Sequence, residues 1–223
     1  MKILQAGMIF IVTAFSIVGC GGGSSGDSGA TGNDNNNGLI GNYYQGATQD
    51  GLGNIGFTGL TKAFSRTDSV IDFWDGTALH RFEPVTGFEE LYSVQWKGFI
   101  NIEVAGDYGF GTISDDGSEV WIDGNLIVDN AEFQYFDWED NISEGDTPGE
   151  TFPTLTLSAG KHEIEVRFFE SFALDGIQLW WLKPNSGVSN IPYKGTNFND
   201  VAPVFDAATN WEIVPSSVLF TSN

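Results

Sequence analysis

Residues 106–128 read GDYGFGTISDDGSEVWIDGNLIV, and the second half of this segment predicts a tight β-hairpin. Two apolar runs, Val120–Ile122 and Leu126–Val128, are separated by Asp123–Asn125 (DGN). An Asp-Gly pair between such runs is typical of a hairpin turn, because these residues accept the positive φ angles that the turn requires. The hairpin follows Asp115–Gly117 (DDG), which by itself is typical of a turn before a strand.

Short alternating runs continue on both sides of the hairpin. Residues of one face occupy every second position in three runs: Ile100, Ile102 and Val104; His162, Ile164, Val166 and Phe168; and Ile177, Leu179 and Trp181. This period of two is expected for strands that bury one face. Turn residues recur at short intervals, and no stretch of about a dozen residues keeps a helical apolar period. We therefore expect an all-β fold, an antiparallel β-sandwich or barrel.

The N-terminus predicts export and lipid anchoring. Ile3–Val18 is a mostly apolar run with the length of a signal-peptide core, short of the ~20 residues that a membrane span needs. It leads into Ile17–Cys20 (IVGC), which resembles the bacterial lipobox, in which the cysteine becomes the lipidated N-terminus. An ordinary signal peptide with an incidental cysteine is the alternative. We expect residues 1–19 to be a lipoprotein signal peptide and residues 20–37 to be a flexible Gly/Ser/Asn-rich tether from the lipidated Cys20.

Composition limits the partners of the remaining domain, residues 38–223. Cys20 is the single cysteine of the chain, so the domain has no intramolecular disulfide and depends on a buried core. The formal net charge is −21. Such an acidic chain repels phosphate backbones and anionic headgroups, so we expect no nucleic-acid partner and membrane attachment through the lipid anchor only. The same charge suits divalent cations, although solvation alone explains most of it.

Several ordered blocks of the domain resemble the protective-antigen (PA14) domain family, a β-sandwich module of toxins, glycosidases and adhesins. The strongest resemblance lies in residues 106–124, GDYGFGTISDDGSEVWIDG. The other blocks follow the family order and are 38–44 (GLIGNYY), 65–73 (SRTDSVIDF), 94–100 (VQWKGFI), 157–164 (LSAGKHEI), 168–170 (FFE), 177–181 (IQLWW) and 213–220 (IVPSSVLF). The resemblance implies an antiparallel β-sandwich with loops at one end, and Trp211 and Phe220 suggest that the C-terminal tail packs on it.

The resemblance also implies a calcium site at the loop end. In sugar-binding members two adjacent aspartates, joined by a cis peptide bond, coordinate a calcium ion that also binds sugar hydroxyls, and Asp115 and Asp116 match this pair. Further ligands come from the loop between the last two core strands. Asp175 is the only carboxylate inside that loop, so we expect it to be the third metal ligand. Phe172 of the same loop either stacks on a bound sugar or fills the loop, and Glu170, at the preceding strand end, is expected to anchor structure.

These features predict a surface-displayed, calcium-dependent carbohydrate-binding module of the lectin or adhesin type, which holds glycans or polysaccharide at the cell envelope. Gly21 follows the lipidated cysteine where an aspartate would retain a lipoprotein at the inner membrane, so an outer-membrane location is expected if the cell is Gram-negative. An envelope protein-interaction or structural module with a structural metal is the alternative. A glycoside hydrolase is the third hypothesis.

No enzyme activity is expected, because the binding module accounts for nearly all of the domain. His80 and His162 are the only histidines, and with Cys20 lipidated no Cys/His nucleophile or zinc cluster remains. Residues 129–153 form a long irregular segment with both aromatic and acidic side chains. Long segments of this kind are often functional, and the alternative is a lid whose aromatic residues cover the sandwich.

The lipidation hypothesis is tested by Cys20→Ser, because serine lacks the thiol to which the lipid is attached. The variant should leave the membrane fraction or accumulate with its signal peptide uncleaved, as measured by fractionation and by the mass of the protein. Unchanged processing and membrane partitioning would contradict lipidation at Cys20.

Overall fold

The computed structural model describes residues 36–49, 54–73, 90–131, 137–140, 155–172, 175–184, 186 and 210–223. The chain divides into two units, Met1–Asp34 and Asn35–Asn223, and all described residues lie in the second unit. Cys20, the signal peptide and most of the expected tether therefore lie outside the described residues. Within the described ranges, no helix has the length and apolarity that crossing a membrane requires.

β-Strands account for most of the described residues. They are β1 (Leu39–Gln45), β2 (Thr48–Gln49), β3 (Ile55–Gly56), β4 (Thr61–Asp68), β5 (Tyr92–Ile102), β6 (Gly106–Asp115), β7 (Ser118–Ile122), β8 (Asn125–Asn130), β9 (Asp137–Asp140), β10 (Leu155–Leu157), β11 (Gly160–Glu170), β12 (Gly176–Leu182), β13 (Glu212–Ile213) and β14 (Leu219–Phe220). A short 3-10 helix, η1 (Ser216–Val218), precedes β14.

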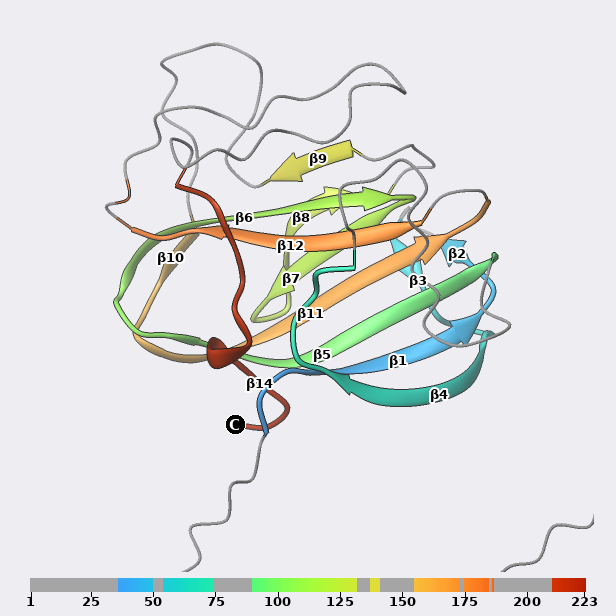
Figure 1. Ribbon diagram of the computed structural model, residues 1–223, viewed down its shortest axis with the longest axis horizontal. Coiled ribbons are helices and arrows are strands. Elements are labelled where there is room, and N and C mark those ends of the chain that lie inside the picture. Colours follow the sequence, from blue (N-terminus) through green and yellow to red (C-terminus); the bar gives the residue numbers. More distant parts are fainter. Residues whose placement is uncertain are drawn as a thin grey trace, which may run out of the picture. The chain divides into compact units, whose positions relative to one another are not determined.

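The strands form two main sheets that pack face to face. The larger sheet has seven strands in the order β4-β1-β5-β11-β7-β8, with β14 added beside β5. The other has five, in the order β10-β6-β12-β13, with β9 paired to β6, while β2 and β3 form a separate pair. Every pairing is antiparallel. Figure 1 shows β6 and β12 lying over β5 and β11, which confirms the predicted all-β antiparallel sandwich.

The core lies between the two sheets and follows the alternation of the sequence. In β11, Ile164, Val166 and Phe168 point inward and are buried. They belong to one apolar cluster with residues of the facing sheet, such as Phe110 of β6 and Leu179 of β12. Because successive residues of a strand point to opposite faces, the same strands present a second, polar row of side chains on the outside of the larger sheet.

The β7–β8 hairpin has the turn that the sequence predicts. Asp123 and Gly124 have φ angles of 48° and 77°. Positive φ at both central residues defines a type I′ turn, whose twist matches that of the flanking strands. Trp121 pairs with Leu126 and Ile122 with Asn125, so the two strands are joined by these two residues alone.

The segment 129–153 is more regular than expected. Asp129 and Asn130 complete β8, and Asp137–Asp140 form β9, which pairs with β6 from Gly111 to Ser114. The expectation of an irregular segment was therefore wrong at these positions. The ladder between β9 and β6 consists of backbone hydrogen bonds, which do not need the alternating side-chain pattern that marks other strands. Residues 132–136 and 141–153 lie outside the described residues.

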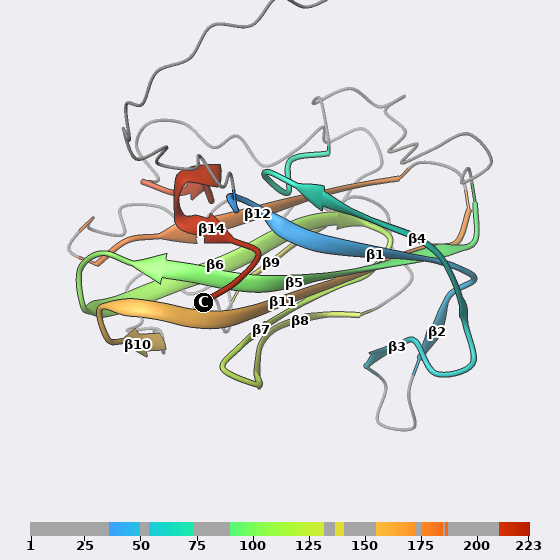
Figure 2. The ribbon, with the colours of Figure 1, turned by 90° about the horizontal axis from the view of Figure 1, so that it is seen from below.

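The two ends of the domain pair with each other. Asn37 forms a bridge with Phe220, and the Thr221 amide donates to the Asn36 carbonyl at 2.7 Å. β14 continues this pairing by adding to β5, and Figure 2 shows the C-terminus beside that strand. The last two residues assigned to the tether are therefore held by the C-terminal segment.

A buried polar cluster fixes β4 against β1 and β5. Asp68 of β4 is almost fully buried, and its Oδ2 accepts hydrogen bonds from the Tyr43 hydroxyl at 2.5 Å and from Trp96 Nε1 at 2.7 Å. Arg66 Nε lies 2.6 Å from the other carboxylate oxygen. Burial, and then the charge of Asp68, raises the pKa of Tyr43, so its hydroxyl stays protonated and remains a donor. One carboxylate therefore holds donors from three strands.

Asp68→Ala should lower the free energy of unfolding by about 3 kcal/mol, because it leaves the buried hydroxyl of Tyr43 and indole N–H of Trp96 without their acceptor. Urea unfolding of the variant and the wild type measures the difference. Glu103→Ala is the control, since Glu103 is exposed, and it should change stability by less than about 0.5 kcal/mol. Equal stabilities of the two variants would contradict this role for Asp68.

Candidate functional site

Four strands bring acidic residues together at one end of the sandwich. β6 ends at Asp115 and β11 ends at Glu170, and both strands point to the right-hand end in Figure 1. Asp115 lies opposite Gly176, the first residue of β12, and Glu170 lies opposite Tyr92, the first residue of β5. Antiparallel pairing therefore gathers residues that are far apart in the sequence.

Asp115 and Asp116 turn inward at this end. The peptide bond between them is cis, and the two residues are only 2% and 7% exposed. Asp116 Oδ2 accepts a hydrogen bond from the Ser171 amide at 2.8 Å, which ties the turn after β6 to the residue after β11. Burial to this degree distinguishes the pair from an ordinary solvent-facing turn.

Glu170 completes a group of three carboxylates. One oxygen each from Asp115, Asp116 and Glu170 lies within 4.8 Å of the others. The Glu170 side chain is fully buried, and neither of its oxygens has a hydrogen-bond partner among the described residues. Burial, followed by the charges of Asp116 and Asp115, raises the pKa of Glu170 to about 10. Without a cation, the carboxylate of Glu170 is therefore held in an environment that disfavours its charge.

Asp175 lies beside this group but outside the set of three. Its side chain is 1% exposed, and its Oδ2 accepts a hydrogen bond from the Tyr92 hydroxyl at 2.5 Å. Burial, and then the charge of Asp175, raises the pKa of Tyr92, so the hydroxyl remains a donor. Asp175 directly precedes Gly176, which lies opposite Asp115, and its charge contributes to the raised pKa of Glu170. The structure thus brings all the expected metal ligands to one end and adds Glu170.

Apolar side chains stand exposed next to the buried acids. Phe172 follows Ser171, and the residue is 67% exposed. Leu91 is also exposed, and its amide donates to the Ser171 carbonyl at 3.3 Å. Phe172 therefore does not fill the interior of its loop, and it presents its ring to solvent beside the carboxylates.

The arrangement fits a hard divalent cation. All three converging side chains offer oxygen ligands, which calcium prefers, whereas zinc sites use nitrogen and sulfur ligands from His and Cys. A glycosidase instead needs two carboxylates flanking an open cleft about 5–9.5 Å apart. Three buried carboxylates whose ligand atoms lie within 4.8 Å of one another do not form such a cleft.

Glu170 is the residue whose role in the cluster the sequence prediction missed. It was expected to anchor structure because it ends a strand. Its position continues the series Ile164, Val166 and Phe168, which faces the core in β11. Because alternate residues of a strand share a face, this position was sufficient to predict that the Glu170 carboxylate faces inward. A fully buried Glu is rare unless it is paired.

The family of the chain follows from comparison with known proteins. A family model described as the PA14 domain matches residues 35–195. The chain belongs to the PA14 domain family. The sequence resemblance is thereby confirmed for the greater part of the chain, while the closing segment, residues 213–220, lies beyond the match.

Several known proteins resemble this chain in sequence or in fold. The anti-sigma-I factor RsgI3 of Acetivibrio thermocellus is 29% identical over 136 residues, which are 60% of this chain and 19% of that protein. An anti-sigma factor domain-containing protein has a TM-score of 0.55 at 24% identity, covering 85% of this chain and 49% of its own. A PA14 sugar-binding domain from an RTX adhesin has a TM-score of 0.51 at 15% identity, covering 84% of this chain and 99% of its own. At these identities the structural matches show the fold alone.

Glu170→Gln should raise the stability of the cation-free domain at pH 7 by ~1–3 kcal/mol, because Glu170, with its pKa raised to about 10, must take up a proton when the domain folds, whereas the neutral amide has a similar shape and needs none. Urea unfolding in EDTA at pH 7 measures this change. Glu163→Gln, at an exposed position of the same strand, is the matched control and should shift stability by less than about 0.5 kcal/mol. A loss of stability in Glu170→Gln would show that the charge of Glu170 is favourably paired.

Proposed function

We propose that this PA14 domain binds a calcium ion and, through it, the hydroxyls of a carbohydrate, as a module anchored at the cell envelope. The observation that carries the proposal is the convergence of Asp115, Asp116 and Glu170, with their ligand oxygens within 4.8 Å and their side chains buried. Buried carboxylates repel one another unless a cation or protons compensate their charge. A divalent cation bound between them removes that repulsion.

Calcium is the cation that these residues suit best. Calcium takes six to eight oxygen ligands in flexible geometry, whereas magnesium needs near-ideal octahedral geometry and keeps several waters. Asp115, Asp116 and Glu170 supply three carboxylate ligands, and Asp175 is the proposed fourth. These side chains leave ligand positions for a sugar diol.

The carbohydrate part of the proposal rests on the surroundings of the cluster. Asp116 is the most exposed of the three carboxylates, and Phe172 offers an exposed ring on the adjoining loop. An aromatic face packs against the apolar face of a sugar ring while the cation binds hydroxyls. The sugar-binding PA14 domain of the adhesin, which has the same fold, supports this function by analogy.

A structural metal is the second candidate. Asp115 and Glu170 are almost fully buried, which favours an ion enclosed by protein over one that is open to a ligand. The relative RsgI3 is named an anti-sigma-I factor and not a sugar-binding protein, and the chain spans about a fifth of its length. In this alternative the metal rigidifies a module that binds protein in the envelope, and no sugar is bound.

Calcium should raise the stability of the domain by ~2.7 kcal/mol at a hundredfold excess over Kd, and EDTA should reverse the change. Thermal unfolding with calcium, with magnesium and with EDTA measures the effect, and magnesium should substitute poorly. Asp116→Asn should remove most of the calcium response, since it keeps an acceptor for the Ser171 amide but loses the charge. Asp107→Asn, at the exposed opposite end of β6, is the matched control and should retain the full response.

The same variants separate the two candidate functions. A glycan array probed with the calcium-loaded protein should give binding that EDTA and Asp116→Asn both abolish. Calcium binding without binding to any glycan on the array would support the structural-metal alternative. A wild-type melting temperature that changes with neither calcium nor EDTA would reject the calcium centre.

A further inference from the structure

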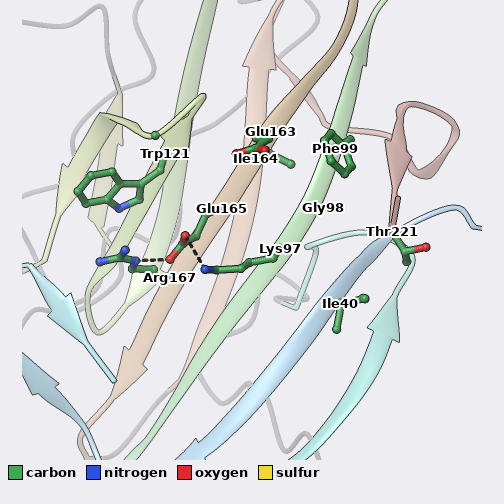
Figure 3. Close-up of a pocket in the computed structure, with 11 residues that line it drawn as sticks. Ile40, Lys97, Gly98, Phe99, Trp121, Glu163, Ile164, Glu165, Arg167 and Thr221 are labelled. Carbon is green, nitrogen blue, oxygen red and sulfur yellow. Dashed lines mark hydrogen bonds and ion pairs between the residues drawn. The ribbon is translucent and has the colours of Figure 1, made fainter. Parts of the chain in front are cut away.

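A hollow with a volume of about 470 Å³ lies on the outer face of the larger sheet (Figure 3). Its size falls within the ~300–1,000 Å³ of typical ligand pockets. Its lining includes Ile40, Lys97 and Trp121, and none of the carboxylates of the buried cluster belongs to it. The hollow is therefore a separate feature from the proposed calcium centre.

The register of the sheet builds this hollow from outward-facing positions. Ile40 of β1 lies opposite Lys97 of β5, Lys97 lies opposite Glu165 of β11, and Glu165 lies opposite Trp121 of β7. These four residues form one row across the sheet, and each neighbours inward-facing core residues in its own strand. Figure 3 shows Trp121 on one side and Ile40 on the other, with the charged side chains between them.

The apolar surfaces of the hollow are held in place. Trp121 Nε1 donates to Glu119 Oε2 at 2.9 Å, and the Arg167 guanidinium lies 4.6 Å from the centre of the indole ring. Ile40, at the opposite side, is 39% exposed. An aromatic ring that is held in place provides a preorganised apolar surface, which lowers the entropic cost of binding.

The polar groups between these surfaces are charged, and their charges balance. Glu165 accepts hydrogen bonds from Gln95 at 2.8 Å and Arg167 at 2.5 Å, and it pairs with Lys97 at 3.2 Å. Burial alone would raise the pKa of Glu165, but these hydrogen bonds and the charges of Arg167 and Lys97 hold it below its ordinary value. Glu163, also in the lining, adds a second carboxylate to match the two cations.

The balance of charge favours a neutral ligand that both donates and accepts hydrogen bonds. Sugar hydroxyls do both, so they can donate to Glu165 or Glu163 and accept from Lys97, while the C–H faces of the rings pack on Trp121. A peptide added as a strand needs a free sheet edge, whereas β5 and β11 are paired on both sides. A polyanion would be repelled by a chain of net charge −21.

We propose that this hollow is a second carbohydrate site, which binds a short neutral oligosaccharide without calcium. It goes beyond the proposed calcium-dependent function and does not depend on it. The two sites lie on different parts of the domain, one at the strand ends and one on the outer face of the sheet.

Isothermal titration of the whole protein in EDTA tests the proposal, with cellohexaose, xylohexaose, mannohexaose and laminarihexaose as probes. At least one probe should bind, and Trp121→Ala should weaken that binding by at least about tenfold. Glu163→Arg, an exposed position where a longer side chain enters the hollow, should weaken it as strongly without unfolding the domain. Trp180→Ala, which removes a partly exposed indole from β12, is the matched control and should bind like the wild type.

The outcomes separate the two proposed sites. Binding in EDTA that survives Asp116→Asn but is lost in Glu163→Arg supports the hollow, even if the calcium centre fails its own test. Absence of binding by all four probes in EDTA would overturn the proposal. So would binding that Trp121→Ala and Glu163→Arg leave unchanged.

Discussion

Repulsion among buried carboxylates is the constraint on which the loop end of this domain depends. Asp115, Asp116 and Glu170 are gathered within 4.8 Å, and Asp175 adds its charge nearby. Backbone pairing between the strands holds these acids in place. The ladder between β11 and β5 fixes Glu170 opposite Tyr92, and the ladder between β6 and β12 fixes Asp115 opposite Gly176. Backbone pairing thus keeps like charges together in a geometry that side-chain repulsion opposes, and this geometry is a preorganised cation site.

The carboxylates of the domain are used in two different ways. Asp68 is satisfied by donors from Tyr43, Trp96 and Arg66, so it stabilises the fold without any added ion. Glu170 is equally buried but has no hydrogen-bond donor among the described residues. The contrast between the two acids explains why one is assigned to the core and the other to a binding site, because burial alone does not distinguish them.

The two faces of β11 carry different polar groups, because successive residues of a strand point to opposite sides. Glu170 shares the inward face with Val166 and Phe168, whereas Glu165 and Arg167 point outward into a network of ion pairs. Inward acids lie in a low dielectric and require compensation, while outward ions are partly solvated and pair with one another. A single strand can therefore contribute to a metal centre and to a surface for a neutral ligand.

The amino-acid sequence alone determined the fold class, the tight hairpin at Asp123 and the family, because each depends on local patterns or on ordered motifs. It also indicated Asp115, Asp116 and Asp175 as the acids of the loop end. The strand β9 was missed, since a ladder of backbone hydrogen bonds leaves no alternating pattern in its side chains.

Only the tertiary structure decided that Glu170 joins the acidic cluster and that Asp175 hydrogen-bonds with Tyr92. The same is true of the row from Ile40 to Trp121, which is assembled across four strands by their register. The physical reason is common to these cases. Contacts between strands distant in the sequence depend on which strands pair, and the local pattern of one strand shows which of its residues face inward but does not name its partner strand.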